Sequence, residues 1–452
     1  MTADQEQALQ LATEAGHILL ENGAEISRVE ETMERIAAAY GVEDESFFVL
    51  SNGIIATGQH YARAEFIPIK GTQLSRVVEV NQLSREVERR RPAGMAQDGV
   101  SVSRRPAGAP MSVSELASRL QAIRTAPGHP AWEIILGIAL GVSAFSILFG
   151  GSLTDAAATL ACGLVLGTFM AYVSPHLSRL IGNVAGGLVG GLLCILAVHL
   201  STLLLSHSAT QPLSHSATQP LSPSAPLHLP NMIIGTIIAL VPGVPFTNGI
   251  RDLANEDYIA GTTRLTDAFL AFLCIALGVA LAFIVDGLFS GGIMQLGSPV
   301  KDPLASAWYI QLPAAFIGTI GFSALFGAPR RYYLECGLAG TAGWAVYLLL
   351  ASAGPTHVVG AAFLGALAVA VMAHLLAVTR RCPVTVFLIC GIIPLVPGGG
   401  IFWTAYYIIT NQLRLAATTG FTALKVTIAI AGAIILAAAL ASRLQRKQVK
   451  NH

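Results

Sequence analysis

Apolar runs of about 20 residues recur along the chain from residue 131 onward, and they limit the possible fold more than any other feature. A run of this length, wound as an α-helix, crosses the ~30 Å hydrocarbon core of a bilayer. The sequence is 53% hydrophobic and only 12% charged, whereas soluble domains carry about 25% charged residues. The chain is therefore predicted to be a polytopic α-helical membrane protein.

We expect ten transmembrane helices, because ten such runs can be separated by polar or Gly/Pro-rich connections. The predicted spans are 131–150, 155–173, 180–204, 230–252, 262–285, 304–326, 333–352, 357–378, 383–409 and 419–442.

The fourth and ninth spans are each interrupted by the same four residues, Leu-Val-Pro-Gly, at 240–243 and 395–398. Proline removes a backbone N–H, and glycine tolerates the irregular backbone that follows. One such break is compatible with an ordinary proline kink. Two at corresponding places predict discontinuous helices that build a transport site near the middle of the membrane.

Short matches indicate that the membrane region is a duplication. Residues 145–150 (FSILFG) resemble 322–327 (FSALFG), and Cys-Gly-Leu occurs at both 162–164 and 336–338. Each half then contains five spans, and an odd number forces the halves into opposite orientations. The sequence predicts two inverted five-helix repeats, residues 129–286 and 287–452.

Basic residues are concentrated in alternate connections, and this asymmetry predicts the orientation. One set of connections has eleven lysines and arginines, and the other has two, Lys301 and Arg414. By the positive-inside rule, both termini are cytoplasmic. The eleven are Arg179, Arg251, Arg264, Arg330, Arg331, Arg380, Arg381, Arg443, Arg446, Lys447 and Lys450.

Residues 1–128 precede the first span and are predicted to form a small cytosolic α+β domain. This segment has no nucleophile motif, so we expect a regulatory or structural cap. A membrane-anchored hydrolase that uses this domain is the competing class. The predicted helices are 4–21, 25–40, 73–90 and 112–125, the strands are 47–50, 53–57 and 64–69, and 91–111 is a loop.

The candidate substrate site is formed by the two breaks. A helix that restarts after a break presents unpaired N–H groups and a positive dipole end, which suit a carboxylate. We expect the two breaks to face one another and to bind the substrate. The candidate residues are Pro242, Gly243, Thr247, Asn248, Pro397, Gly398, Gly399 and Thr404.

Four charged residues are candidates for gating or coupling, because ionisable groups in membrane spans are costly. Arg251 and Asp252 form either a cytoplasmic gate or part of a hydrated loop. Asp267 is a coupling candidate, or it pairs with nearby Arg264. Lys425 is the fourth candidate, or its side chain snorkels to the membrane surface.

We expect no metal site and no cofactor. The six cysteines have no ligand spacing, and no Walker motif is present. The octapeptide LSHSATQP occurs twice, at 205–212 and 213–220, and we interpret it as a flexible linker rather than a metal-binding segment.

Three stretches resemble the threonine/serine exporters (ThrE): Asn22–Glu31 with Ser51–Thr57, Leu240–Asp252, and Ile393–Gly399. The resemblance covers nearly the whole chain. It implies a secondary exporter of small amino acids in the bacterial inner membrane, driven by the proton motive force. Relatives that split the two halves into separate proteins are associated with succinate export.

The substrate stays open at this stage between threonine or serine and a C4-dicarboxylate. An amino acid needs an acceptor for its ammonium, such as backbone carbonyls at 239–242 or Asp267. A dicarboxylate needs a second cation, for which Arg251 or Lys425 could serve. A passive channel is a further alternative. Protons and the lipid bilayer are the other expected partners, nucleic acid is not, and a homo-oligomer is left open.

Overall fold

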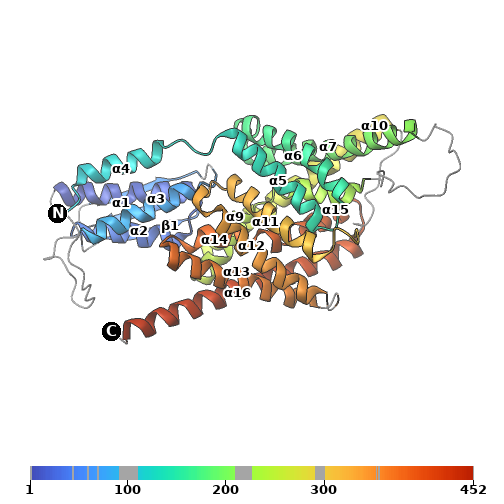
Figure 1. Ribbon diagram of the computed structural model, residues 1–452. Coiled ribbons are helices and arrows are strands. Elements are labelled where there is room, and N and C mark those ends of the chain that lie inside the picture. The colour runs from blue at the N-terminus through green and yellow to red at the C-terminus, as the bar shows by residue number, and fades with distance from the viewer. Residues whose placement is uncertain are drawn as a thin grey trace.

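The computed structural model describes residues 3–42, 45–58, 61–68, 71–90, 110–208, 227–290, 301–352, 354 and 357–450. Within these ranges, a helical bundle has a smaller α/β unit attached to one end, and both ends of the chain lie on that side (Figure 1). Most of the predicted loop 91–111, and most of the duplicated octapeptide, lie outside the described residues.

The described residues of the N-terminal unit form four helices and a three-stranded antiparallel sheet of order β1-β2-β3. The third strand runs from Tyr61 to Phe66 rather than from 64 to 69, because Gly58 pairs with Tyr61 and Gly53 with Phe66, which uses the whole of β2. The elements are α1 (Ala3–Glu21), α2 (Ile26–Ala39), β1 (Ser46–Leu50), β2 (Gly53–Gly58), β3 (Tyr61–Phe66), α3 (Leu74–Arg89) and α4 (Val113–Thr125).

The bundle has the helices expected of a membrane protein, although their number differs from the prediction. Its helices are α5 (Ala131–Leu148), α6 (Leu153–Tyr172), α7 (Arg179–Ser208), α8 (Leu229–Ile237), α9 (Gly243–Ala254), α10 (Tyr258–Ser290), α11 (Trp308–Leu325), α12 (Tyr333–Ala351), α13 (Val358–Arg380), α14 (Val384–Ile392), α15 (Gly398–Ile409) and α16 (Leu413–Lys450).

Eight described helices are long and apolar enough to cross a membrane, and a ninth span is possible if the bent pair α14–α15 counts as one. The pair α8–α9, predicted as the fourth span, is not among them. Both of its helices are short, and α9 carries Arg251 and Asp252.

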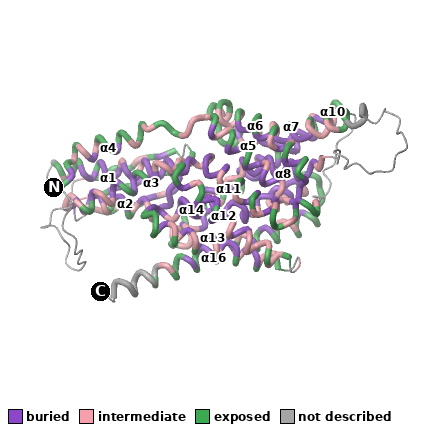
Figure 2. The backbone as a smooth tube through the Cα atoms, in the orientation of Figure 1, coloured by how far each residue is buried: buried purple, intermediate pink, exposed green. Residues whose placement is uncertain are grey.

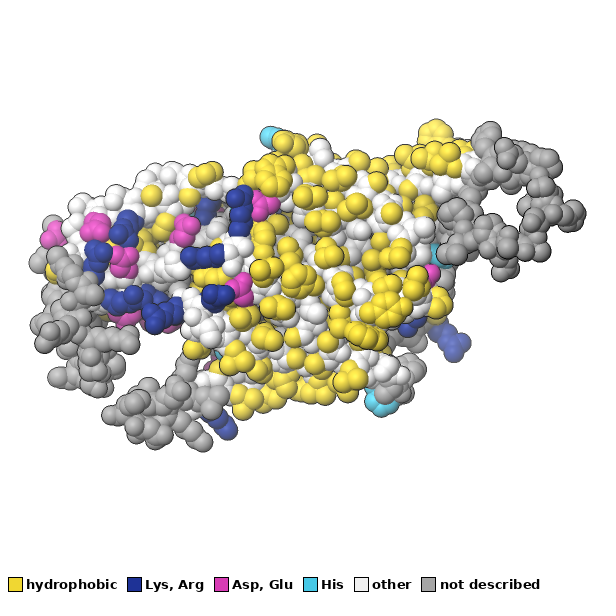
Figure 3. Space-filling view, viewed as in Figure 1, with side chains coloured by type: hydrophobic (Ala, Val, Ile, Leu, Met, Phe, Trp, Pro, Cys, Tyr) yellow, Lys and Arg dark blue, Asp and Glu magenta, His cyan; other side chains and the backbone are white. Residues whose placement is uncertain are grey.

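Side-chain chemistry separates the two parts of the molecule. Hydrophobic side chains cover the visible surface of the bundle, whereas charged side chains gather over the N-terminal unit (Figure 3). Large apolar residues of the bundle, such as Leu203 and Phe289, are exposed. Buried residues run through the middle of the bundle (Figure 2). An apolar exterior of this extent suits hydrocarbon rather than water.

Helices α5 and α11, which begin the two predicted halves, pack against each other in opposite directions. A Cβ added to Gly141 would lie 3.1 Å from Phe322, and one added to Gly318 would lie 3.1 Å from Phe145. The two phenylalanine rings meet edge to face, with centroids 5.1 Å apart. The contact is reciprocal. Gly141 of α5 packs on Phe322 of α11, and the corresponding Gly318 of α11 packs on Phe145 of α5.

Several other helices of the two predicted halves pack in corresponding pairs. Helix α7 packs on α10, as α13 packs on α16. Helix α9 contacts both α10 and α16, and α15 also contacts both. The half-helices that follow the breaks, α9 and α15, therefore both lie against α10 and α16.

Glycines allow the closest of these helix contacts. A Cβ on Gly278 of α10 would lie 2.1 Å from the Val184 carbonyl oxygen of α7, and one on Gly187 would lie 2.3 Å from the Ile275 carbonyl oxygen. These neighbours are backbone atoms and cannot rotate away, so only glycine fits.

We expect Gly278→Val to force α7 and α10 apart and to lower stability by about 1–3 kcal/mol or more, the usual cost of overpacking. The measurement is the thermal unfolding midpoint of the detergent-purified protein. Gly360→Val is the matched control, because no atom lies within 4 Å of a Cβ added there. Equal midpoints for the two variants would contradict this account of the α7–α10 contact.

Candidate functional site

The two helix breaks have nearly the same backbone conformation. Pro242 has φ −76° and ψ 60°, and Pro397 has φ −75° and ψ 42°. The N–H of Gly243 donates to the Val241 carbonyl at 2.8 Å, and the N–H of Gly398 donates to the Val396 carbonyl at 2.7 Å. Both breaks are thus inverse γ-turns centred on proline.

A new helix begins directly after each turn, as the sequence predicts. In α15 the first helical bond joins the Ile401 N–H to the Pro397 carbonyl, so the N–H groups of Gly399 and Gly400 precede the helical ladder. Such N–H groups and the helix dipole favour an anion. The hydroxyls of Thr247 and Thr404 donate to the carbonyls of Gly243 and Gly400, at 2.9 and 2.8 Å, which leaves their acceptor lone pairs for another group.

The two breaks lie against one another in the fold. A Cβ added to Gly398 would lie 3.2 Å from Ile238 and 3.3 Å from Val241, and one on Gly399 would lie 3.3 Å from Ile234. On the other side, no atom lies within 4 Å of a Cβ built on Gly243. The structure therefore brings together two irregular turns, two helix N-termini and a small open space beside Gly243.

Asn248 lies further along α9, where the N-terminal unit covers the helix. Its side-chain N–H donates to the Gly23 carbonyl at 2.6 Å. The side-chain N–H of Asn255 donates to the Ser27 hydroxyl at 3.0 Å. Gly23 has φ +83°, so this turn between α1 and α2 has the left-handed conformation that favours glycine. We call residues 22–27 the α1–α2 turn.

A buried ion pair anchors this contact. Asp252 and Arg264 are 0% and 3% exposed, and their side chains are joined at 2.7 Å. Asp252 also accepts the N–H of Ile26 at 3.2 Å, and Arg264 donates to the Ala24 carbonyl at 3.0 Å. Two oppositely charged groups in the bundle thus bind a backbone N–H and a carbonyl of the α1–α2 turn.

Arg251 links the same cluster to the second break. It forms an ion pair with the buried Glu25 and donates to the Thr385 hydroxyl of α14 at 3.0 Å. Helix α14 is the segment that precedes Pro397. The predicted gating residues Arg251 and Asp252 therefore lie together, in a network that includes Glu25 and Arg264.

The other two charged candidates lie elsewhere. Asp267 pairs with Arg179 at 3.1 Å, and both side chains are nearly half exposed. The alternative in which Asp267 pairs with Arg264 is wrong, because Arg264 faces inward to Asp252. Lys425 is exposed on α16, which is compatible with snorkelling. Neither residue is in the buried network beside the break.

Helix α15 has aromatic residues where α9 has polar ones. Trp403 lies 5.5 Å from Tyr406 and 5.4 Å from Tyr407, measured between ring centroids. With the two Pro-Gly turns superposed in sequence, Trp403, Tyr406 and Tyr407 correspond to Asn248, Arg251 and Asp252. The two half-helices thus share a beginning but differ in the chemistry of their far ends.

Sequence reasoning missed Glu25 and Arg264 as partners in the network, and also the buried Asp155. Asp155 accepts N–H groups from Ser152 and His228, each at 2.7 Å. The Ser152-x-x-Asp155 spacing is a capping-box pattern, a signal that could have identified this cap. No comparable local signal marks Glu25. In the ranges that the structure describes, no group of three or more His, Cys, Asp and Glu could hold a metal ion.

We predict that Asp252→Ala lowers the free energy of unfolding by about 3–5 kcal/mol, because Arg264 would be left buried and unpaired. Asp267→Ala is the matched control, since it breaks an exposed pair worth about 1 kcal/mol or less. Thermal unfolding of the purified variants measures both. An Asp252→Ala midpoint as high as that of Asp267→Ala would mean that the buried pair does not hold the N-terminal unit on the bundle.

Comparison with known proteins extends these observations. The family model described as "Putative threonine/serine exporter" matches residues 10–97 and 100–285, and that described as "Threonine/Serine exporter, ThrE" matches 311–440. A "Probable threonine/serine exporter" of Mycobacterium tuberculosis is 25% identical over 227 residues, which are 48% of this chain and 42% of that protein. The chain therefore aligns with less than half of that relative.

The "Probable succinate transporter subunit YjjP" of Escherichia coli is 23% identical over 298 residues, which are 64% of this chain and 98% of that protein. No solved structure matches the chain.

Proposed function

Because the chain belongs to the threonine/serine exporter family, we propose that it is a secondary transporter that exports small amino acids such as threonine or serine. The observation that carries this proposal is the pair of matching proline γ-turns in contact with each other. Discontinuous helices that meet inside a membrane bundle form substrate sites in transporters. Membership of an exporter family is also consistent with a protein that is not an enzyme.

We propose that the bundle consists of two inverted repeats, residues 129–286 and 287–452, with α8–α9 and α14–α15 as equivalent broken spans. The antiparallel, reciprocal contact of α5 and α11 supports this, since a two-fold axis in the membrane plane would generate it. The corresponding packing of α7 on α10 and of α13 on α16 also supports it. Alternating access would then be a movement of one half against the other.

The proposed substrate site has a place for each end of an amino acid. The carboxylate would bind the N–H groups of Gly399 and Gly400 at the start of α15. Within residues 239–242, the carbonyls of Val241 and Pro242 already accept the N–H groups of Gly243 and Phe246. The ammonium would therefore bind the carbonyls of Ala239 and Leu240. The hydroxyls of Thr247 and Thr404 would complete the site, with Pro242, Gly243, Pro397 and Gly398 shaping it.

A dicarboxylate is the second candidate substrate, and the match to the Escherichia coli protein over 98% of its length favours considering it. A second carboxylate would need a cation near the breaks. Arg251 is already paired with Glu25, and Lys425 is exposed. This distribution of cations favours the amino acid.

We further propose that the N-terminal unit, residues 1–128, is a gate. Asn248 would reach the substrate only after it releases Gly23, and the Asp252–Arg264 pair holds the α1–α2 turn in place. With the basic connections on the inside of a bacterial inner membrane, this gate would close the cytoplasmic side, and both termini would be cytoplasmic.

Efflux from proteoliposomes tests the proposed function. Vesicles loaded with labelled threonine, serine or succinate are diluted with and without an imposed pH gradient. We expect efflux of threonine or serine that the pH gradient accelerates. Succinate efflux alone would move the proposal to a dicarboxylate carrier, and efflux that ignores the gradient would contradict proton coupling.

The same assay tests the site. Pro397→Ala restores a backbone N–H and allows the helix to continue through the break, so we expect efflux to fall about tenfold or more, equivalent to ~1.4 kcal/mol in the barrier. Pro313→Ala is the matched control, because Pro313 lies inside α11 at an exposed position. Normal efflux in Pro397→Ala would contradict the proposed site.

Cross-linking tests the gate. Ser27 and Asn255 touch across the interface, so cysteines at both positions should be joined by a short thiol cross-linker, and efflux should stop until the link is reduced. Five of the six native cysteines are buried, which limits side reactions. A cysteine pair at Glu14 and Arg124, which join α1 to α4 within the unit at 3.4 Å, is the control. Full efflux in the linked Ser27–Asn255 protein would exclude the gate.

A further inference from the structure

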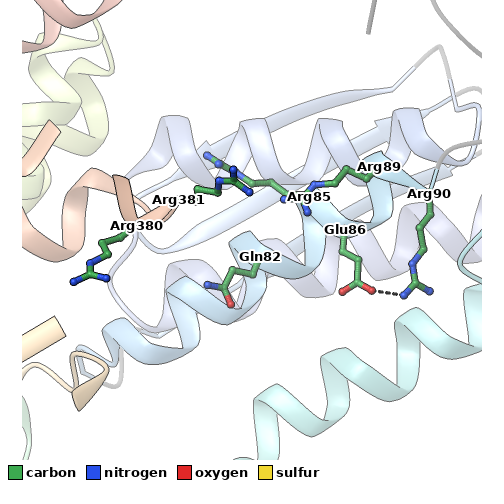
Figure 4. A pocket seen from close by; sticks show the side chains of 7 residues that line it. All are labelled: Gln82, Arg85, Glu86, Arg89, Arg90, Arg380 and Arg381. Atoms are coloured by element: carbon green, nitrogen blue, oxygen red, sulfur yellow. Dashed lines mark hydrogen bonds and ion pairs between the residues drawn. The ribbon is translucent and has the colours of Figure 1, made fainter. Parts of the chain in front are cut away.

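An open cavity of about 460 Å³ lies between α3 of the N-terminal unit and the end of α13 (Figure 4). Five arginines line it: Arg85 and Arg89 of α3 with Arg90 directly after that helix, and Arg380 of α13 with Arg381 directly after it. Glu86 is the one carboxylate among the lining residues that the structure describes. We call this space the arginine cavity. It is separate from the helix breaks and from the α1–α2 turn.

Carboxylates near the cavity neutralise only part of its charge. Glu86 is shared between Arg90 and Arg119, and Glu115 is shared between the same two arginines. Glu335 pairs with Arg380. Of the charged groups in the described ranges, none forms an ion pair with Arg85, Arg89 or Arg381. Three carboxylates thus serve six arginines: Arg85, Arg89, Arg90, Arg119, Arg380 and Arg381. Glu31 and Glu88 also lie near Arg85, but they pair with Arg28 and Arg35.

Helix dipoles do not remove this excess. Both α3 and α13 end at the cavity, and a helix C-terminus supplies roughly half a unit of negative charge. Two such ends offset about one of the three unpaired guanidinium groups. Burial lowers the pKa of Arg85 and the neighbouring Arg35 and Arg28 lower it further, whereas Glu31 and Glu88 offset part of this effect.

The backbone at Arg381 also places an arginine where another residue would be favoured. Arg381 ends α13 in the left-handed conformation, with φ 52° and ψ 44°, and glycine or asparagine is preferred at this position. A residue that departs from the local preference often has a functional reason. Here it lines the arginine cavity opposite α3.

The ligand that fits these observations carries phosphate. Guanidinium groups bind phosphate oxygens in a bidentate geometry, and Arg is preferred where such recognition matters. Arg380 is the last residue of a helix that is long enough to cross a membrane, so the cavity opens where lipid headgroups would lie. A headgroup and a soluble phosphate compound would present the same chemistry.

We propose that the arginine cavity is a binding site for a phosphate-bearing anion, which bridges α3 of the N-terminal unit to the end of α13. A bound anion would neutralise the repulsion among Arg85, Arg89 and Arg381 and would hold the unit against the bundle. Because the anion would bind the folded protein and not the unfolded chain, its binding should raise the unfolding temperature.

The experiment measures the thermal unfolding midpoint of the full-length protein in detergent. One arm titrates inorganic phosphate against sodium chloride of equal ionic strength. The other compares micelles doped with short-chain phosphatidylglycerol or with phosphatidylcholine. The variant is Arg85→Gln/Arg89→Gln. The matched control is Arg63→Gln/Arg124→Gln, which removes two exposed arginines of the same unit outside the cavity.

We expect phosphate or phosphatidylglycerol to raise the midpoint of the wild type and the control. In the cavity variant the apparent dissociation constant should rise on the order of 10-fold for each arginine lost. A shift with phosphate indicates a soluble ligand, and a shift with phosphatidylglycerol alone indicates a lipid headgroup. If the double variant does not fold, the exposed Arg381→Gln replaces it. No shift in the wild type, or equal shifts in variant and control, would overturn the proposal.

Discussion

Inside a bilayer every backbone polar group needs a partner within the protein, and this constraint shapes the whole molecule. Long helices satisfy it along most of the chain. At Pro242 and Pro397 the helical ladder is interrupted, and each interruption is limited to an inverse γ-turn. The turns lie against each other and are enclosed by α10 and α16 through the half-helices that follow them. The irregular backbone is therefore kept away from the outer surface of the bundle.

The two half-helices share a starting geometry but lead to different surroundings. Beyond the first turn, the far end of α9 carries Arg251 and Asp252 and contacts the N-terminal unit. The ion pair of Asp252 with Arg264, which is almost fully buried, anchors this contact. Beyond the second, α15 carries stacked aromatic rings. Two matching turns are thus followed by a buried ion pair in one case and by aromatic packing in the other.

The sequence predicts well what depends on local chemistry. Proline and glycine fix where a helix stops, so both breaks are found where Leu-Val-Pro-Gly indicates, and the helices and hairpin of the N-terminal unit follow from similar signals. It fails where a partner is chosen by three-dimensional packing. Arg264 is three residues from Asp267, which makes that pair plausible, yet burial turns Arg264 toward Asp252. The contact of Ile26 with Asp252 spans 226 residues, and no local pattern announces it. Whether Lys425 faces lipid or protein is likewise decided by the rotation of α16.

The α1–α2 turn is held mostly through its main chain. Three of its contacts with the bundle use the carbonyls of Gly23 and Ala24 and the N–H of Ile26. Two others use the side chains of Glu25 and Ser27. Any residue supplies the main-chain atoms, so their recognition depends on the path of the backbone, and Gly23 with its positive φ is the position that sets this path. Apart from Glu25 and Ser27, side chains of the turn can therefore diverge between related proteins while the main-chain contacts persist. Divergence at Asn248, Asp252 or Arg264 would have to be compensated, because there the side chain itself makes the bond.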